Sequence, residues 1–334
     1  MAYVEPVTRA AGYVIPASEW AQNTVDNPIA LKALIDATGA QYPCHGRLTL
    51  TTAVPVTTAD VTAATTIYFA LLGGDQIGLH DGASTWTDET FAELSIAVPA
   101  TTSQVYDVFV YNNAGTPTLE LSAAWTTPGS ARFASGPYAT LLPTQNGVSV
   151  KSTNGTAIDS TRRYVGSFGT TTVSGQTEDS FAKRLVWNYY HRADRPMRVL
   201  DTTASWAYTV SVWRQARATA TNQLEFVIGV SEDLVEARVS IQVKNTTGTN
   251  VGIGVAIGLD STSAIATGAD AGVTRSGPAQ FDTLAGVYRG FTGIGRHTLV
   301  WLERSEATGT TTWFGSGFDA FGPTAYGITG HLKG

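Results

Sequence analysis

The nine residues VGIGVAIGL, at positions 251–259, constrain the fold of this chain more than any other stretch. Large apolar residues fill every second position, and small residues fill the positions between them. This alternation is typical of a β-strand, because successive side chains of a strand point to opposite faces. Glycine weakens a strand, so the small residues predict that another backbone or sheet packs closely against that face, at Gly252, Gly254 and Gly258.

A similar alternation runs through most of the chain after residue 41 and predicts a mainly β protein. Residues 67–72 form a continuous apolar run, and the loop NNAGTP separates two strand-like segments as in a hairpin. The dipeptides Asn146-Gly147 and Asn154-Gly155 predict further turns. Strand-like runs resume in the second half of the sequence, at 206–212, 224–230, 239–243 and 299–301.

Length and composition indicate how these strands are organised. At 334 residues the chain is long enough for two domains that each bury a core. We predict two β-sandwich or jelly-roll-like domains, at 41–180 and 181–334. Charged residues make up only 14% of the chain, against roughly 25% in a typical soluble domain. Such a composition suits β structure whose faces are partly covered by neighbouring chains.

The first 40 residues carry a helical pattern instead. Pro16 suits a first helical turn, and Asp26-Asn27-Pro28 repeats this signal after a capping residue. We therefore expect a short helical segment, with helices over 16–25 and 28–38. Helices shorter than ~12–15 residues are marginal in water, so these two need a surface that covers their apolar side. That surface is either the body of the same chain or another protein.

Charge and hydropathy exclude two classes of partner. The net charge is −6, and Lys and Arg do not cluster into the basic face that nucleic-acid binding requires, so we expect no nucleic-acid partner. No run approaches the ~18 apolar residues of a membrane span, and the N-terminus lacks the apolar region of a signal peptide. We expect a protein made in a cytoplasm, without membrane insertion.

The sequence offers few candidates for catalysis or for metal and cofactor binding. The five histidines are dispersed, without the spacing of a zinc site. Residues 73–81 lack the Lys-Ser/Thr of a phosphate loop. Cys44 is the only cysteine, and no Gly-x-Ser-x-Gly motif is present. We therefore predict no metal, no cofactor and no enzymatic activity.

The segment FAKRLVWNYYHRADRPMRVL, at 181–200, combines aromatic residues with arginines. Aromatic faces stack on sugar rings and guanidinium groups bind anions, so a groove for an anionic surface glycan is one interpretation. Its residues would be Trp187, Tyr189, Tyr190 and Arg192. The alternative is that the aromatic residues are core or subunit-interface anchors and the arginines pair with acids of a neighbouring chain.

Several segments of the chain carry a resemblance to a protein family. The N-terminal stretch AAGYVIPASEWAQNTVDNPIAL resembles the starts of tailed-bacteriophage minor structural and fibre-like proteins. The runs YDVFVYNNAGTPTLEL, TTTVSGQTEDSFAKRLVWNYYHR and GTTTWFGSG are similar to segments of phage tail-fibre and other structural proteins. This resemblance implies a virion component with an N-terminal anchor and a β-rich exposed body, commonly a homotrimer.

The leading hypothesis is a non-enzymatic tail fibre, head spike or capsid decoration protein located in the virion. Residues 1–40 would bind other virion proteins, in the capsid or tail, through Trp20, Asn23, Asn27, Ile29, Leu31 and Leu34. One alternative is a receptor-binding protein that recognises host surface glycan through the 181–200 segment. A further alternative is a polysaccharide depolymerase, which would need a pair of carboxylates across a cleft.

Overall fold

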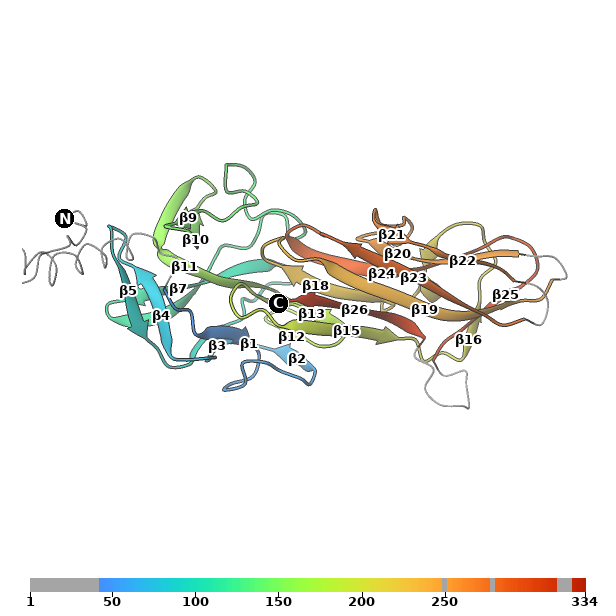
Figure 1. Ribbon diagram of the computed structural model, residues 1–334, viewed down its shortest axis with the longest axis horizontal. Coiled ribbons are helices and arrows are strands. Elements are labelled where there is room, and N and C mark those ends of the chain that lie inside the picture. The colour runs from blue at the N-terminus through green and yellow to red at the C-terminus, as the bar shows by residue number, and fades with distance from the viewer. Residues whose placement is uncertain (1–41, 248–250, 277–279, 317–325) are drawn as a thin grey trace, which may run out of the picture.

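The computed structural model describes residues 42–247, 251–276, 280–316 and 326–334, which form an elongated body built almost entirely of strands (Figure 1). The prediction of a mainly β protein is confirmed. The helices expected within residues 1–40 lie outside the described residues. No helix in the described ranges is long and apolar enough to cross a membrane.

Residues 42–190, called the first half below, form several small sheets at one end of the body. One sheet has the order β1-β3-β6, with β1 at Gly46–Thr49, β3 at Thr66–Leu71 and β6 at Leu94–Ala97. A two-stranded sheet pairs β4 (Gln76–His80) with β5 (Trp86–Thr90). The largest has the order β8-β7-β11-β10-β9, with β14 also on β11: β7 (Val105–Asn113), β8 (Thr116–Leu121), β9 (Thr144–Gln145), β10 (Val148–Thr153), β11 (Ala157–Gly169) and β14 (Val186–Asn188).

Two facing sheets make up the rest of the body. The first contains the order β15-β26-β19-β23: β15 (Asp194–Leu200), β26 (Gly327–Lys333), β19 (Val235–Asn245) and β23 (Asp282–Gly290). The second contains β18-β24-β20-β22: β18 (Gln223–Ile228), β24 (Gly295–Ser305), β20 (Val251–Leu259) and β22 (Gly272–Ser276). Counted along the chain, these eight strands are ordered 1-8-3-6 and 2-7-4-5. This is the strand order of a jelly roll, and "the jelly roll" denotes these eight strands below.

Short strands also belong to both sheets. In the first sheet these are β16 (Ser205–Ala207), β21 (Ala269–Asp270) and β25 (Thr311–Phe314), and in the second β2 (Val61–Ala64), β12 (Thr177–Asp179), β13 (Lys183–Arg184) and β17 (Arg214–Gln215). Because β13 pairs in parallel with β18, the second sheet continues from the jelly roll into the first half. One sheet therefore crosses the position near residue 180 where we expected a domain boundary. The division into two domains stays a prediction.

The two halves also share a hydrophobic core. Phe109 and Tyr164 of the first half belong to the same buried cluster as Val239 and Trp301 of the jelly roll. Three arginines donate across this junction to backbone carbonyl oxygens of the other half: Arg47 to Gly334 at 2.5 Å, Arg132 to Gly229 at 2.6 Å and Arg296 to Thr170 at 2.8 Å. A guanidinium can satisfy several carbonyls at once, so these contacts fix the halves against each other.

Strand β20 contains the glycine-rich stretch, and its large residues point into the core between the two sheets. The close neighbours of its small face come from the same chain. A Cβ on Gly254 would lie 2.9 Å from the Trp213 ring, and one on Gly258 would lie 2.3 Å from a backbone oxygen of Ser261. At Gly252 the neighbour is the Glu306 carboxylate, at 2.8 Å. Side chains and a following loop thus cover this face, and the close backbone that we predicted is present at Gly258.

The strand expected over 206–212 is shorter than predicted. Strand β16 ends at Ala207, and Val210 and Val212 are 48% and 60% exposed. The chain turns after Tyr208, whose hydroxyl donates to the Val212 carbonyl at 2.7 Å, and Trp213 then packs over the outer face of β20 and β24. The alternation was misleading because Val210 and Val212 are exposed, so apolar residues at alternate positions do not mark a buried face here.

Candidate functional site

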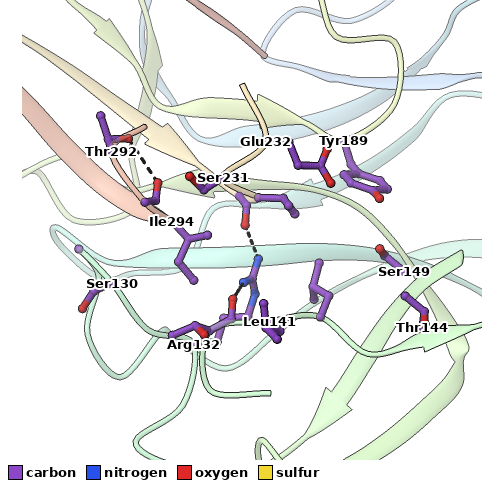
Figure 2. A pocket seen from close by; sticks show the side chains of 16 residues that line it. Ser130, Arg132, Leu141, Thr144, Ser149, Tyr189, Ser231, Glu232, Thr292 and Ile294 are labelled. Atoms are coloured by element: carbon purple, nitrogen blue, oxygen red, sulfur yellow. Dashed lines mark hydrogen bonds between the residues drawn. The ribbon is translucent and has the colours of Figure 1, made fainter. Parts of the chain in front are cut away.

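A pocket of about 570 Å³ opens at the junction of the two halves (Figure 2). One wall comes from the first half, between Gly129 and Ser149, and the other from the connections Gly229–Glu232 and Thr292–Ile294 of the jelly roll. Its volume lies within the ~300–1,000 Å³ of typical small-ligand sites. In Figure 2, the side chains of Tyr189, Leu141 and Ile294 lie around the Arg132 guanidinium. This pocket is the candidate functional site.

The Arg132 side chain lines the pocket and contacts both of its walls. Its side chain is buried, and it donates to both carboxylate oxygens of Asp107, at 2.7 and 3.2 Å. It also donates to the carbonyl oxygens of Gly229 and Thr140, at 2.6 and 2.8 Å, one from each wall. The Ser167 hydroxyl donates to Asp107 as well, at 2.7 Å. Because these contacts occupy both groups of the ion pair, the Arg132–Asp107 pair shapes the pocket and is not available to bind an anion.

The four residues predicted to bind glycan contact one another, but of these only Tyr189 lines the pocket. Tyr189 is half-buried and lines the pocket, where its ring packs against Tyr164 and Tyr190 at centroid distances of 5.5 and 5.0 Å. Trp187 is 1% exposed and belongs to the shared core, which favours the core interpretation for this residue. Tyr190 lies under the Arg163 guanidinium, at 4.7 Å, away from the pocket lining.

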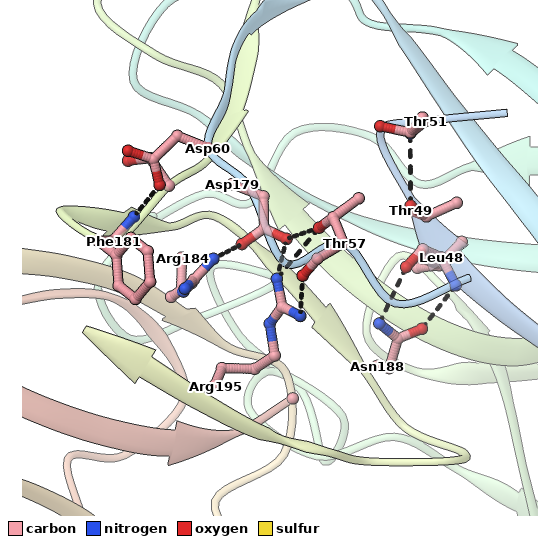
Figure 3. Close-up of polar contacts among 12 residues, drawn as sticks. Leu48, Thr49, Thr51, Thr57, Asp60, Asp179, Phe181, Arg184, Asn188 and Arg195 are labelled. Atoms are coloured by element: carbon pink, nitrogen blue, oxygen red, sulfur yellow. Dashed lines mark hydrogen bonds and ion pairs between the residues drawn. The ribbon is translucent and has the colours of Figure 1, made fainter. Parts of the chain in front are cut away.

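Acids of the same chain pair with the arginines that suggested an anionic glycan. Arg192 makes ion pairs with Glu232 and Asp233. Although burial opposes it, hydrogen bonds and charges from these two carboxylates raise the pKa of Arg192. Arg184 and Arg195 share Asp179, as Figure 3 shows. The alternative interpretation assigned these acids to a neighbouring chain, and for these three arginines that assignment is wrong.

The polar contacts in Figure 3 connect the chain between residues 48 and 60 with that between 179 and 195. Asn188 accepts from the Leu48 N–H at 2.6 Å and donates to the Leu48 carbonyl at 3.1 Å, as a backbone partner would. Arg195 also donates to the Thr57 carbonyl at 2.9 Å. Buried polar groups need such partners. These contacts therefore stabilise the fold, and we do not treat this cluster as a candidate binding site.

His297, whose side chain is buried, contacts Asp260, whose side chain is 47% exposed, and this contact predicts a pH dependence. The His297 ring nitrogen lies 2.8 Å from one Asp260 oxygen, and the Thr298 N–H donates to the other at 2.7 Å. Burial opposes ionisation, but these hydrogen bonds lower the pKa of Asp260 below its ordinary value of 3.8. A lowered pKa contributes stability above pH 3.8, and this contribution is lost as the pH falls through the folded-state value.

Asp260→Asn should therefore flatten the loss of stability below pH 3.8, as measured by urea unfolding at a series of pH values. Residue 260 has φ 52°, which asparagine tolerates, so the change mainly removes the charge. Asp88→Asn, at an exposed position on β5, is the matched control and should leave the pH profile as in the wild type. Equal profiles for Asp260→Asn and the wild type would contradict the prediction.

Comparisons with known proteins leave the family open. No protein-family model matches this chain, and no curated protein sequence matches it. Solved structures that align with it include the insecticidal δ-endotoxin Cry8Ea1 from Bacillus thuringiensis, with a TM-score of 0.24 and 8% identity, over 87% of this chain and 52% of the toxin. For infectious bursal disease virus, Gx strain, the TM-score is 0.23 and the identity 8%, over 84% of this chain and 77% of the viral chain.

A third aligned structure is the mosquito-larvicidal Cry4Aa toxin from Bacillus thuringiensis, with a TM-score of 0.21 and 11% identity, over 82% of this chain and 51% of the toxin. The chain thus spans about half the length of the two toxins. Similarities this low carry no argument about function, so the proposals below rest on the molecule itself.

Proposed function

We propose that the chain is a non-enzymatic structural protein of a virus particle, of the fibre, spike or capsid-decoration type, anchored through residues 1–40. The observation that carries this proposal is the arrangement of the body along its long axis. Tyr42, the first described residue, stacks on Trp86 of β5 at 5.3 Å, and β5 lies at the end opposite the far loops of the jelly roll (Figure 1). An anchor that precedes Tyr42 would leave the jelly roll free to project.

Two further features support this proposal. Jelly rolls recur in viral capsid and lectin domains, although a fold alone does not determine function. Arginines of the 181–200 segment are also paired within the chain, such as Arg184 and Arg195 with Asp179. In the proposed role the body assembles as a homotrimer, and Trp20, Ile29, Leu31 and Leu34 contact another virion protein.

Trp20→Ala tests the anchor. The wild-type chain should have the native mass of a trimer and join virus particles, whereas the variant should keep this mass and be absent from them. Light scattering measures the mass, and immunoblotting of purified particles measures incorporation. The expected loss is complete because a short helix without its main apolar anchor has little surface to bury. Normal incorporation of Trp20→Ala would contradict the anchor, and a monomeric wild-type chain would contradict the trimeric fibre or spike.

A receptor-binding function is the second candidate, and the pocket at the junction favours it. Tyr189 is the one residue of the predicted glycan-binding set that lines this pocket. The depolymerase alternative stays a prediction. Glu232 is the only acidic residue among the described residues of the pocket lining, and hydrolysis of a glycosidic bond ordinarily uses two carboxylates. Release of shorter sugars from host polysaccharide would favour it.

A further inference from the structure

We infer that the pocket at the junction binds an uncharged saccharide and that Tyr189 is the surface on which one sugar ring stacks. The inference rests on the receptor-binding candidate above and names its ligand class. It replaces the anionic glycan that the sequence suggested, because the arrangement of charges around the pocket disfavours an anion.

Unused hydroxyl groups provide the first argument. The side-chain hydroxyls of Ser149, Thr144, Ser231 and Tyr189 line the pocket, and within the described part of the chain they have no hydrogen-bond partner. Ser149 is itself a buried residue at the pocket wall. A hydroxyl both donates and accepts, so a ring of such groups suits a ligand that presents many hydroxyls of its own.

Apolar side chains between these hydroxyls provide the second argument. Leu141, Leu142, Val230 and Ile294 line the same pocket beside the Tyr189 ring. A sugar ring has apolar C–H faces and a polar edge, which such a mixed lining matches. Tyr189 is held in place by its ring contacts with Tyr164, Trp187 and Tyr190. A fixed aromatic ring loses little conformational entropy when a ligand stacks on it.

The balance of charge provides the third argument. Arg132 is neutralised by Asp107 beneath the pocket. Glu232 lines the pocket, and the single positive charge of Arg192 faces two carboxylates, those of Glu232 and Asp233. One negative charge is thus in excess beside the pocket. A sialylated or uronic-acid saccharide would bring a like charge towards these carboxylates, whereas a neutral sugar would not be repelled.

The Arg132 contacts also make the pocket largely preformed. Arg132 joins the Thr140 carbonyl of one wall to the Gly229 carbonyl of the other. Little of the binding free energy is therefore lost to ordering the two walls. A preformed pocket of about 570 Å³ has room for a small oligosaccharide.

The test uses the full chain and a set of methyl glycosides of glucose, galactose, mannose, rhamnose and N-acetylglucosamine at millimolar concentration. Saturation-transfer NMR should detect binding of at least one of them, and an array of neutral and acidic oligosaccharides should show retention of neutral ones. Tyr189→Ala should weaken binding at least about tenfold, which corresponds to the loss of roughly 1.4 kcal/mol.

A second variant tests the pocket independently, in case Tyr189→Ala misfolds. Leu141 is 66% exposed, so Leu141→Asp should fold and should also weaken binding at least about tenfold, because it places a charge in the lining. Val273→Asp is the matched control, since Val273 is 68% exposed and lies outside the pocket lining, and it should bind as the wild type does.

Each other result overturns a specific part of the inference. Retention of acidic saccharides alone would leave glycan recognition standing and contradict the uncharged class. Binding that survives both Tyr189→Ala and Leu141→Asp would place the saccharide elsewhere. No binding of any saccharide would remove both the inference and the receptor-binding candidate, while the particle role would still be decided by the Trp20→Ala experiment.

Discussion

Replacing Arg132 with leucine is expected to lower the free energy of unfolding by about 3–5 kcal/mol, because it breaks a buried ion pair by removing one partner. The Asp107 and Arg132 side chains are only 3% and 2% exposed. Without the guanidinium, the Asp107 carboxylate stays buried with the Ser167 hydroxyl, and the Gly229 carbonyl loses its Arg132 donor. Urea unfolding of the full chain measures the loss.

Arg289→Leu is the matched control for this experiment. Arg289 pairs with Glu236 at 2.8 Å, but its side chain is 67% exposed, so water screens the pair. Exposed ion pairs contribute about 0–1 kcal/mol, and the control should lose no more than that. If Arg132→Leu lost as little as Arg289→Leu, the Arg132 contacts would not hold the junction together, and the pocket would not be preformed.

Local patterns predicted much of the secondary structure. The alternation at 251–259 gives β20, and the loop NNAGTP joins β7 to β8 as the hairpin expected. The Asn-Gly pairs form the turns between β9 and β10 and between β10 and β11, with Asn146 and Asn154 at φ 52° and 54°. These features depend on residues close in sequence, and Asn and Gly adopt positive φ more readily than other residues do.

Long-range pairing could not be predicted in the same way. Strand β15 pairs with β26, so Leu200 lies opposite Gly327. No local pattern specifies such a partner, although it decides the jelly-roll order. The acids that neutralise Arg192 follow it by about forty positions, at Glu232 and Asp233. An arginine among aromatic residues therefore looks the same in sequence whether it faces a ligand or an acid of its own chain.

Sequence reasoning also missed most of the pocket. Its walls are loops from distant parts of the chain, and only Tyr189 belonged to a predicted site. One signal was present, because Leu141 and Leu142 form an apolar pair in a stretch rich in polar and small residues. An apolar pair in an otherwise polar loop is a reason to look for a binding surface there.

Substitutions of Trp187 and Tyr189 can distinguish a core role from a ligand-binding role within the WNYYHR segment. Trp187→Ala is expected to cost about 3–5 kcal/mol of stability, as is usual for a large aromatic residue removed from a core. The ring is tightly enclosed: a Cβ on Gly229 would lie 2.5 Å from it, and Arg192 lies over it at 5.3 Å. The cavity could collapse only by moving strands at the junction.

Trp213→Ala provides the comparison, since Trp213 is only half-buried over the outer face of β20. This substitution should lower the free energy of unfolding clearly less than Trp187→Ala does. Urea unfolding measures both variants, and saturation-transfer NMR with the same methyl glycosides follows binding. A Trp187→Ala protein with wild-type stability and no saccharide binding would restore Trp187 as a ligand contact. A large loss of stability would assign Trp187 to the core and leave Tyr189, which is half-buried and lines the pocket, as the aromatic contact.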